Sequence, residues 1–380
     1  MKIAMVSHYT SQSRYVSELA AALSRNGGKV TVYTRRDRRG QPAETTTDAG
    51  YRVVRLSAGP AKPMARNELV PHLGEFATAL AEDWRRDSPD VVHAHYWMSG
   101  VASLLAARKL PVPVVQTYYS LAAVERDNEG GSDRQLPHRI RMERLVGRRA
   151  SWIVATCSDE VTQLATLGVP RYKTSVVPGG VDCEMFAPDE LFASRGDRFR
   201  LLTVGPLVPY SGFGDVIAAV AKVPAAELVI VGGPDAGELG DDEEAKRLWR
   251  LADRLGAADR IRLTGNVSTD ERVRLLRWAD VVVCAPWYEP LGLVALEAMA
   301  SGTPVVATEV GCLRDSVVHG VTGEHVPARR PDVLAATLHR LSVDLVTIEE
   351  YGVAGRDRAM SRFGWDRIAA DATRVYEQVC

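Results

Sequence analysis

Short apolar segments that resemble β-strands alternate with amphipathic helical segments along almost the whole sequence. The strand-like segments are rich in β-branched residues and apolar at successive positions, as in strands that are buried on both faces of a parallel sheet. Helical segments between such strands cover both faces of the sheet, which predicts a doubly wound α/β domain. In the first half of the chain the strand-like segments lie at 2–7, 29–34, 51–56, 90–95, 112–118, 152–156 and 174–177.

The same alternation starts again after a stretch rich in Pro, Gly and Asp at 178–198. A chain of 380 residues is also too long for one ordinary core. We therefore predict two Rossmann-like doubly wound domains, at 1–180 and at 198–362, with a cleft between them. The strand-like segments of the second domain lie at 200–205, 227–232, 260–265, 280–286 and 303–308.

The last segment, 364–380, has a helical pattern of its own. Trp365, Ile368 and Val375 are spaced so that they can anchor one face of a helix. This pattern leaves two arrangements open. The helix either covers the second domain or returns to the first.

Composition excludes several classes of protein. With 47 basic and 48 acidic residues the formal net charge is −1, which gives no basis for nucleic-acid binding. No apolar run reaches the roughly 18 residues of a membrane span, and the sequence enters a strand directly, so we expect neither a signal peptide nor integral membrane association. The five cysteines are scattered and form no C-x-x-C pair, which predicts a cytoplasmic protein without structural zinc.

A turn between a strand and a helix at 201–220 has the form of a phosphate-binding site. The first N–H groups of a helix are unpaired and the helix dipole is positive there, so such turns bind phosphate. Gly205, Ser211 and Gly212 lie in this turn, yet Gly205 to Phe213 contains no Lys, Arg or His. The sequence therefore predicts an anion site without a cation of its own.

A second strand-to-helix segment, 287–308, carries two carboxylates. Glu289 ends a loop, Pro290 stands where a helix can begin, and Gly292 permits close approach of a ligand to the backbone. Glu297 follows Glu289 by eight residues, just over two helical turns, so both side chains can face one ligand. Alternatively, Glu289 only complements the helix dipole and Glu297 is solvated.

The motif E-P-x-G-x-x-x-x-E-A-M-A-x-G-x-P-V-V-A in this segment resembles the donor-binding segment of a large family of retaining glycosyltransferases. That family includes sucrose synthases, sucrose-phosphate synthases and the mycothiol-pathway glycosyltransferase. The segments 90–100, 176–188 and 315–327 are similar to the same family, and the resemblance covers almost the whole chain. It implies the GT-B fold of two Rossmann-like domains and a C-terminal helix that returns to the first domain.

The resemblance also implies roles for individual residues. Glu289 would contact the hydroxyls of the transferred sugar, Glu297 would bind the nucleotide ribose, and the amides near Gly292 and Leu293 would hold the diphosphate. No metal or cofactor is implied. On the acceptor side, the residues that we expect near the reacting groups are His93, His95, Trp97 and Tyr119, although a core role is an alternative for the two histidines and for Trp97.

The sequence departs from the family pattern in the residues that would hold the donor. Pro206 and Ser211 stand where an Arg and a Lys neutralise the diphosphate, and Tyr119 replaces a His. The connection after the first strand is short, and Cys312 replaces a glycine of the loop 310–317. Two arginines near these places could supply the missing charge, Arg14 and Arg314, with an ordinary surface position as the alternative for both.

We therefore predict a cytoplasmic retaining glycosyltransferase that uses a nucleotide-activated sugar and a small polar acceptor. The changed donor positions suggest an unusual substrate, as in actinobacterial antibiotic biosynthesis, and an oligomer is compatible with the sequence. One alternative is a catalytically silent pseudo-glycosyltransferase that acts as a binding partner. Another is a phosphoribosyl or sugar-phosphate transferase on the same fold.

Overall fold

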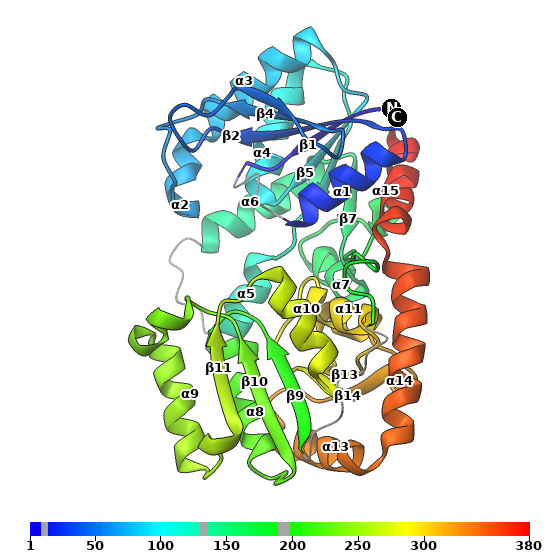
Figure 1. Cartoon of the computed structure of the whole chain (residues 1–380). Coiled ribbons are helices and arrows are strands. Elements are labelled where there is room, and N and C mark those ends of the chain that lie inside the picture. Colours follow the sequence, from blue (N-terminus) through cyan, green and yellow to red (C-terminus); the bar gives the residue numbers. More distant parts are fainter. Residues whose placement is uncertain (9–13, 130–135, 189–197) are drawn as a thin grey trace. The chain divides into compact units, whose positions relative to one another are not determined.

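The computed structural model describes residues 1–8, 14–129, 136–188 and 198–380 (Figure 1). The chain forms two compact units. Unit 1 consists of Met1–Pro178 together with Trp365–Cys380, and unit 2 is Gly179–Gly364.

Within the described residues, the sheet of unit 1 has eight strands in the order β3-β4-β2-β1-β5-β6-β7-β8. Neighbouring strands pair in parallel, except that β3 runs antiparallel to β4 at the edge. Buried apolar residues along the central strands form the core, as the alternating pattern predicted. The strands are β1 (Lys2–Val6), β2 (Lys29–Arg35), β3 (Glu44–Thr46), β4 (Arg52–Leu56), β5 (Val91–His95), β6 (Val114–Thr117), β7 (Trp152–Ala155) and β8 (Thr174–Val176).

Helices cover the sheet of unit 1, and the C-terminal helix is one of them. It packs beside α1, where the rings of Tyr15 and Trp365 lie 5.3 Å apart, and Figure 1 shows the two helices next to each other. Its expected anchors Trp365, Ile368 and Val375 are buried. The helices are α1 (Arg14–Arg25), α2 (Arg66–Leu69), α3 (Leu73–Arg86), α4 (Trp97–Ala106), α5 (Ala122–Glu129), α6 (Leu136–Arg149), α7 (Ser158–Thr166) and α15 (Trp365–Val379).

Unit 2 has a six-stranded sheet in the residues that the structure describes, in the order β11-β10-β9-β12-β13-β14. Its strands pair in parallel, and one apolar cluster lies on each face of the sheet. The strands are β9 (Phe199–Val204), β10 (Ala226–Val231), β11 (Ile261–Gly265), β12 (Val281–Cys284), β13 (Val305–Thr308) and β14 (Gly323–Val326). The helices are α8 (Phe213–Val220), α9 (Glu243–Arg254), α10 (Thr269–Trp278), α11 (Leu293–Ala300), α12 (Gly311–Ser316), α13 (Pro331–Val343) and α14 (Leu345–Arg358).

Both sheets reverse their strand order near the middle. In unit 1 the reversal lies between β1 and β5, and in unit 2 it lies between β9 and β12. Open α/β sheets bind ligands at the carboxyl ends of the strands that flank such a reversal, because the following helices leave in opposite directions there. The two-domain α/β fold is therefore confirmed, and each unit presents one edge at which a site is expected.

Candidate functional site

A small pocket lies at the carboxyl ends of β9 and β12 in unit 2. Its walls come from the turn that leads to α8 and from the loop that leads to α11. None of the described residues that line it is Lys, Arg or His. The lining includes Gly205, Pro206, Ser211, Cys284, Glu289 and Gly292.

The turn before α8 approaches the end of β12 so closely that only glycine fits. Gly212 has a left-handed φ of 74°, and a Cβ atom there would lie 1.8 Å from the carbonyl oxygen of Ala285. The neighbouring Ser211 hydroxyl donates a hydrogen bond to the carbonyl oxygen of Pro206 at 2.7 Å. The hydroxyl proton that could have met a phosphate is thus bonded within the turn itself.

Glu289 folds back over the start of the following helix. Its Oε1 accepts hydrogen bonds from the N–H groups of Leu291 and Gly292, both at 3.0 Å. Burial raises the pKa of Glu289, while these two N–H groups act in the opposite direction. The expected helix start at Pro290 is wrong: α11 begins at Leu293, because Gly292 adopts a left-handed φ of 65° that ends the loop.

Glu297 lies inside α11 and is only 5% exposed, so it is not a solvated surface residue. Its Oε2 pairs with Nε of Arg272 on α10 at 3.3 Å. Burial, and then the charges of Glu289 and Glu297, raise the pKa of the Cys284 thiol. Glu289 lines the pocket together with Cys284, and Glu297 is not among the lining residues. Glu289 precedes α11 instead of belonging to it, so the spacing of eight residues does not place the two carboxylates on one helical face.

The loop 310–317 is fastened to the Glu289 loop. Gly311 has a positive φ of 48°, and a Cβ atom there would lie 2.1 Å from the Glu289 carbonyl oxygen. The N–H of Cys312 donates to the same carbonyl at 2.8 Å, and its thiol donates to the Pro290 carbonyl. Arg314 is exposed and donates to the Glu309 carbonyl oxygen at 3.2 Å, and it does not line the pocket.

In unit 1, His93 on β5 is held in the core. Its Nδ1 is hydrogen-bonded to the Tyr376 hydroxyl of α15 at 2.7 Å and its Nε2 to Oγ1 of Thr117 at 2.9 Å. The residue is 1% exposed, and burial lowers its pKa to about 3. His93 thus connects the C-terminal helix to the sheet as a neutral imidazole.

The structure brings His95 and Tyr119 together. Nδ1 of His95 is hydrogen-bonded to the Tyr119 hydroxyl, and the two rings are stacked with an angle of 13° between their planes. Burial, and then His93, hold the pKa of His95 well below its usual value. Tyr119 has an unusual positive φ of 64°, and its ring packs edge-on against Tyr15 of α1.

The other two residues predicted for the acceptor side, Trp97 and Arg14, differ in exposure. Trp97 is the first residue of α4 and is 7% exposed, as a core residue is. Arg14 is the first residue of α1 and is half-buried. The short connection that precedes it, residues 9–13, lies outside the described residues.

Sequence reasoning missed a group of two arginines around Tyr96 at the β1–β5 reversal. Tyr96, which follows β5 with a positive φ of 73°, has the guanidinium groups of Arg66 and Arg139 over its ring at 5.2 and 5.3 Å. Arg139 is 8% exposed, and it pairs with Glu143 at 2.7 Å and with Glu125. The three residues that form this group are far apart in sequence, so no local pattern indicates it.

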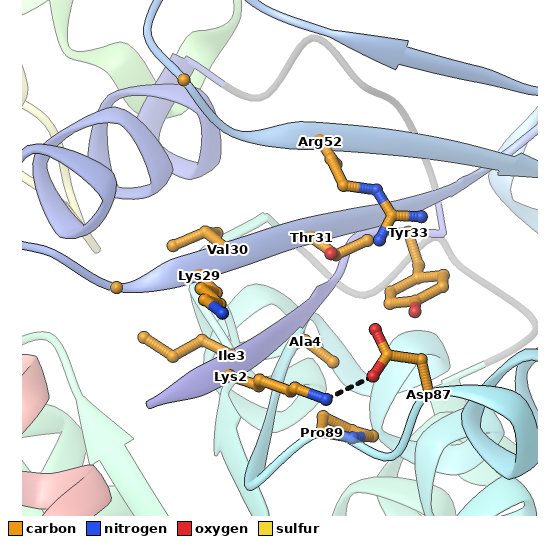
Figure 2. Close-up of a pocket in the computed structure, with 12 residues that line it drawn as sticks. Lys2, Ile3, Ala4, Lys29, Val30, Thr31, Tyr33, Arg52, Asp87 and Pro89 are labelled. Atoms are coloured by element: carbon orange, nitrogen blue, oxygen red, sulfur yellow. Dashed lines mark hydrogen bonds and ion pairs between the residues drawn. The ribbon is translucent and has the colours of Figure 1, made fainter.

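A larger hollow of about 250 Å³ lies at the opposite, amino-terminal edge of the same sheet (Figure 2). Lys2, Lys29 and Arg52 stand at the starts of their strands and line it. Figure 2 shows Lys2 paired with Asp87, and the three cations together lower the pKa of that carboxyl. Because ligands of such sheets bind at the carboxyl edge, we do not assign the reaction to this hollow.

Among the described residues, no three His, Cys, Asp or Glu side chains come together as a metal-binding group. None of the described helices combines the length and the apolar character that a membrane span requires.

Comparisons with known proteins agree with the two-domain α/β fold. Residues 11–180 match the Glycosyl transferase 4-like domain, and residues 190–355 match Glycosyl transferases group 1. A D-inositol 3-phosphate glycosyltransferase of Kribbella flavida is 34% identical over 99% of this chain and 95% of its own length. Among solved structures, sucrose-phosphate synthase from Thermosynechococcus elongatus superimposes with a TM-score of 0.88 at 28% identity, covering 100% of this chain and 99% of that one.

The HepE protein of Anabaena, solved in complex with UDP and glucose, shares the fold with a TM-score of 0.78 at 19% identity over the full length of both chains. Structural neighbours of this kind have the GT-B architecture. The sequence relative from Kribbella flavida is a glycosyltransferase that this chain matches over 95% of its length. This chain belongs to the glycosyltransferase family and is an enzyme of that class.

Proposed function

We propose that this enzyme transfers a sugar, with retention of its anomeric configuration, from a nucleoside-diphosphate sugar to a small polar acceptor. The observation that supports the proposal best is the arrangement of Glu289, Gly292 and Glu297 at the mouth of α11. Glu289, whose carboxylate accepts from the Leu291 and Gly292 N–H groups, lines the pocket at the carboxyl end of β12, and the buried Glu297 follows inside α11.

The two carboxylates suit the two ends of the donor. The Gly292 N–H donates to Glu289, so we propose that the N–H groups from Leu293 on hold the diphosphate, because the first N–H groups of a helix have no partner within it. Glu289 would accept hydrogen bonds from sugar hydroxyls, and Glu297 would accept them from the ribose. Gly205, Ser211 and Gly212 would form the opposite wall through their backbone.

The donor wall has no positive charge among its described lining residues, and this bears on the substrate. Charge-assisted hydrogen bonds contribute about 1.5–3 kcal/mol each, so a wall without Lys or Arg binds an ordinary diphosphate less tightly than a wall that has them. We therefore propose that the donor is an unusual one, in natural-product biosynthesis such as that of an antibiotic. The five free cysteines, all within the described ranges, support a reducing cytoplasm.

For the acceptor we propose a phosphorylated polyol. Arg66 lies over Tyr96 at the carboxyl edge of the unit 1 sheet, and its guanidinium suits a phosphate group, whereas Arg139 on the same ring is already paired with Glu125 and Glu143. The relatives' name, D-inositol 3-phosphate glycosyltransferase, supports the same class of acceptor. His95, Trp97 and Tyr119 adjoin Tyr96 and would surround the polyol ring.

The proposed reaction needs no nucleophile from the protein. The bond between the sugar's anomeric carbon and the diphosphate oxygen breaks as the acceptor hydroxyl forms a bond on the same face. The acceptor proton passes to the departing phosphate oxygen. Glu289 would stabilise the oxocarbenium-like sugar through its hydroxyls, and no metal takes part in this scheme.

An assay with UDP-, GDP-, ADP- and TDP-sugars and inositol phosphate tests the proposal. We expect release of one nucleoside diphosphate and a product with the donor's anomeric configuration by proton NMR. Glu289→Gln should lower kcat by about 10²–10³-fold, as loss of a group that acts on transition-state charge does. The control Glu309→Gln, at an exposed carboxylate paired with Arg314, should retain activity. Absence of turnover with every donor would favour the catalytically silent alternative.

A further inference from the structure

We propose that Arg272 is a positioning residue that fixes the Glu297 carboxylate for the donor ribose and thereby sets the preference for ribonucleotides. The inference rests on the proposed function, since it concerns the same donor site. Arg272 lies on α10, outside the motif that carries both carboxylates.

The contact itself is direct. Nε of Arg272 lies 3.3 Å from Oε2 of Glu297, and the two residues come from adjacent helices of unit 2. Glu297 is 5% exposed, whereas the Arg272 side chain keeps 26% of its surface exposed. The ion pair is therefore buried on the carboxylate side and reaches solvent on the guanidinium side.

A buried carboxylate needs such a partner. Removing an ionised carboxylate from water costs several kcal/mol unless an opposite charge or hydrogen bonds replace the water. At this site the demand is greater, because Glu289 lines the pocket beside Cys284, and the charges of both carboxylates raise the pKa of the Cys284 thiol. A donor diphosphate would add further negative charge, so the cation of Arg272 offsets repulsion that would otherwise expel the ligand.

Arg272 is itself held in place. Its guanidinium lies over the ring of Phe186, 6.0 Å from the ring centre, and Phe186 is fully buried. Because Phe186 holds the Arg272 guanidinium in place, the guanidinium can in turn hold Oε2 of Glu297. This contact fixes the plane of the Glu297 carboxylate before a ligand binds. Such preorganisation improves discrimination because the ligand does not have to order the group that reads it.

The selectivity that should follow concerns the ribose hydroxyls. A carboxylate held in one orientation can accept hydrogen bonds from a ribose, and a 2′-deoxyribose cannot satisfy it fully. Sites built to hydrogen-bond a hydroxyl discriminate strongly against an analogue that lacks it, since a buried acceptor is left unpaired. Loss of Arg272 should therefore lower the ratio of the affinity for a ribonucleotide to the affinity for its 2′-deoxy analogue, while the protein stays folded.

The test is calorimetric titration of the full chain with three matched pairs of ligands: UDP and 2′-deoxy-UDP, ADP and 2′-deoxy-ADP, GDP and 2′-deoxy-GDP. For the pair that binds, we expect wild type to prefer the ribonucleotide by about tenfold or more, the value of one hydrogen bond to a charged group. Arg272→Met should lower the preference for the ribonucleotide to about that of Glu297→Gln. Arg272→Lys, which keeps the positive charge, should retain most of the wild-type preference. Arg274→Met, at an exposed arginine of the same helix, should leave the ratio unchanged.

The outcomes separate this inference from the proposed function. If wild type prefers the ribonucleotide and Arg272→Met keeps the full preference, the positioning role is wrong while the donor site stands. If wild type binds no diphosphate, or binds both members of each pair equally, the ribose role of Glu297 fails and the inference fails with it. Thermal unfolding checks that each variant is folded, and Arg272→Gln replaces Arg272→Met should the latter be unfolded.

Discussion

The His93 ring of β5 and the Tyr376 hydroxyl of α15 lie 2.7 Å apart, although 283 residues separate them in sequence. Both side chains are buried, and the other ring nitrogen of His93 is bonded to Thr117. The contact fastens the C-terminal helix to the sheet of unit 1. It also assigns His93 a structural part, whereas the sequence had suggested the acceptor side.

Tyr376→Phe should therefore destabilise the protein without changing its chemistry. The substitution leaves Nδ1 of His93 buried and unpaired, which costs about 1–3 kcal/mol. Urea unfolding should show the loss, and kcat per folded molecule should stay near the wild-type value. The matched control is Tyr172→Phe, at a tyrosine that is 81% exposed, which should be neutral. Equal stability of the two variants would contradict the structural role.

Stability should fall as the pH falls below about 6.5. Burial lowers the pKa of His8 to about 4 and that of His93 to about 3, against 6.5 in the unfolded chain. Between these values only the unfolded state binds the protons, so acid favours unfolding. Each histidine should contribute up to about 2 kcal/mol between pH 6.5 and 5, at about 1.4 kcal/mol per pH unit.

A histidine variant separates this effect from the protonation of carboxylates, which also changes stability in acid. His8→Gln removes one titrating group, so its unfolding free energy should decline less steeply between pH 6.5 and 5 than that of wild type. Above pH 7 the two slopes should coincide, because both histidines are then neutral in both states. Parallel curves over the whole range would show that His8 titrates normally in the folded protein.

Gly212→Ala should damage the donor pocket. A Cβ atom at this position would lie 1.8 Å from the Ala285 carbonyl oxygen, and the φ of 74° is unfavourable for alanine. We expect a loss of about 2 kcal/mol or more in stability and weaker nucleotide binding. Gly214→Ala is the control two residues later in α8, where the nearest neighbour is the flexible end of Arg247. It should be neutral or slightly stabilising, and similar losses in both variants would refute the steric account.

Arg66→Gln should affect the acceptor and spare the donor. If Arg66 meets an acceptor phosphate, its removal should raise KM for inositol phosphate by about 10–100-fold, the value of a charge-assisted hydrogen bond. The affinity for the nucleotide should not change. Arg85→Gln, at an exposed arginine of α3, serves as the control. An unchanged KM would remove Arg66 from the acceptor site.

Much of the fold could be predicted from the sequence, because strands buried on both faces of a parallel sheet appear as short runs of consecutive apolar residues. The central strands and the C-terminal helix occupy the residue ranges that these patterns indicated, although the pattern of the last helix did not tell which domain it covers. The edge strand β3 was missed, since its sequence Glu44–Thr46 is short and polar and it exists only through pairing with β4. The start of α11 was misplaced by three residues because the sequence does not reveal that Gly292 is left-handed.

The candidate site divides in a similar way. Glu289 and Glu297 are eight residues apart, so a motif could indicate both. Arg272 and the pair of arginines around Tyr96 reach their places only through packing of separate elements, and no local spacing records such contacts. The hydrogen bond from Ser211 to Pro206 was equally hidden, because it depends on how the turn closes.

The central claim is that unit 2 binds a nucleotide donor at the mouth of α11. Calorimetric titration of the purified chain with UDP, GDP, ADP and TDP, repeated with Glu297→Gln, tests it most directly. We predict that one diphosphate binds to wild type and that the variant binds it at least about tenfold more weakly, the cost of losing a hydrogen bond to a charged group. Failure of all four to bind at millimolar concentration, or equal binding by wild type and Glu297→Gln, would contradict the claim.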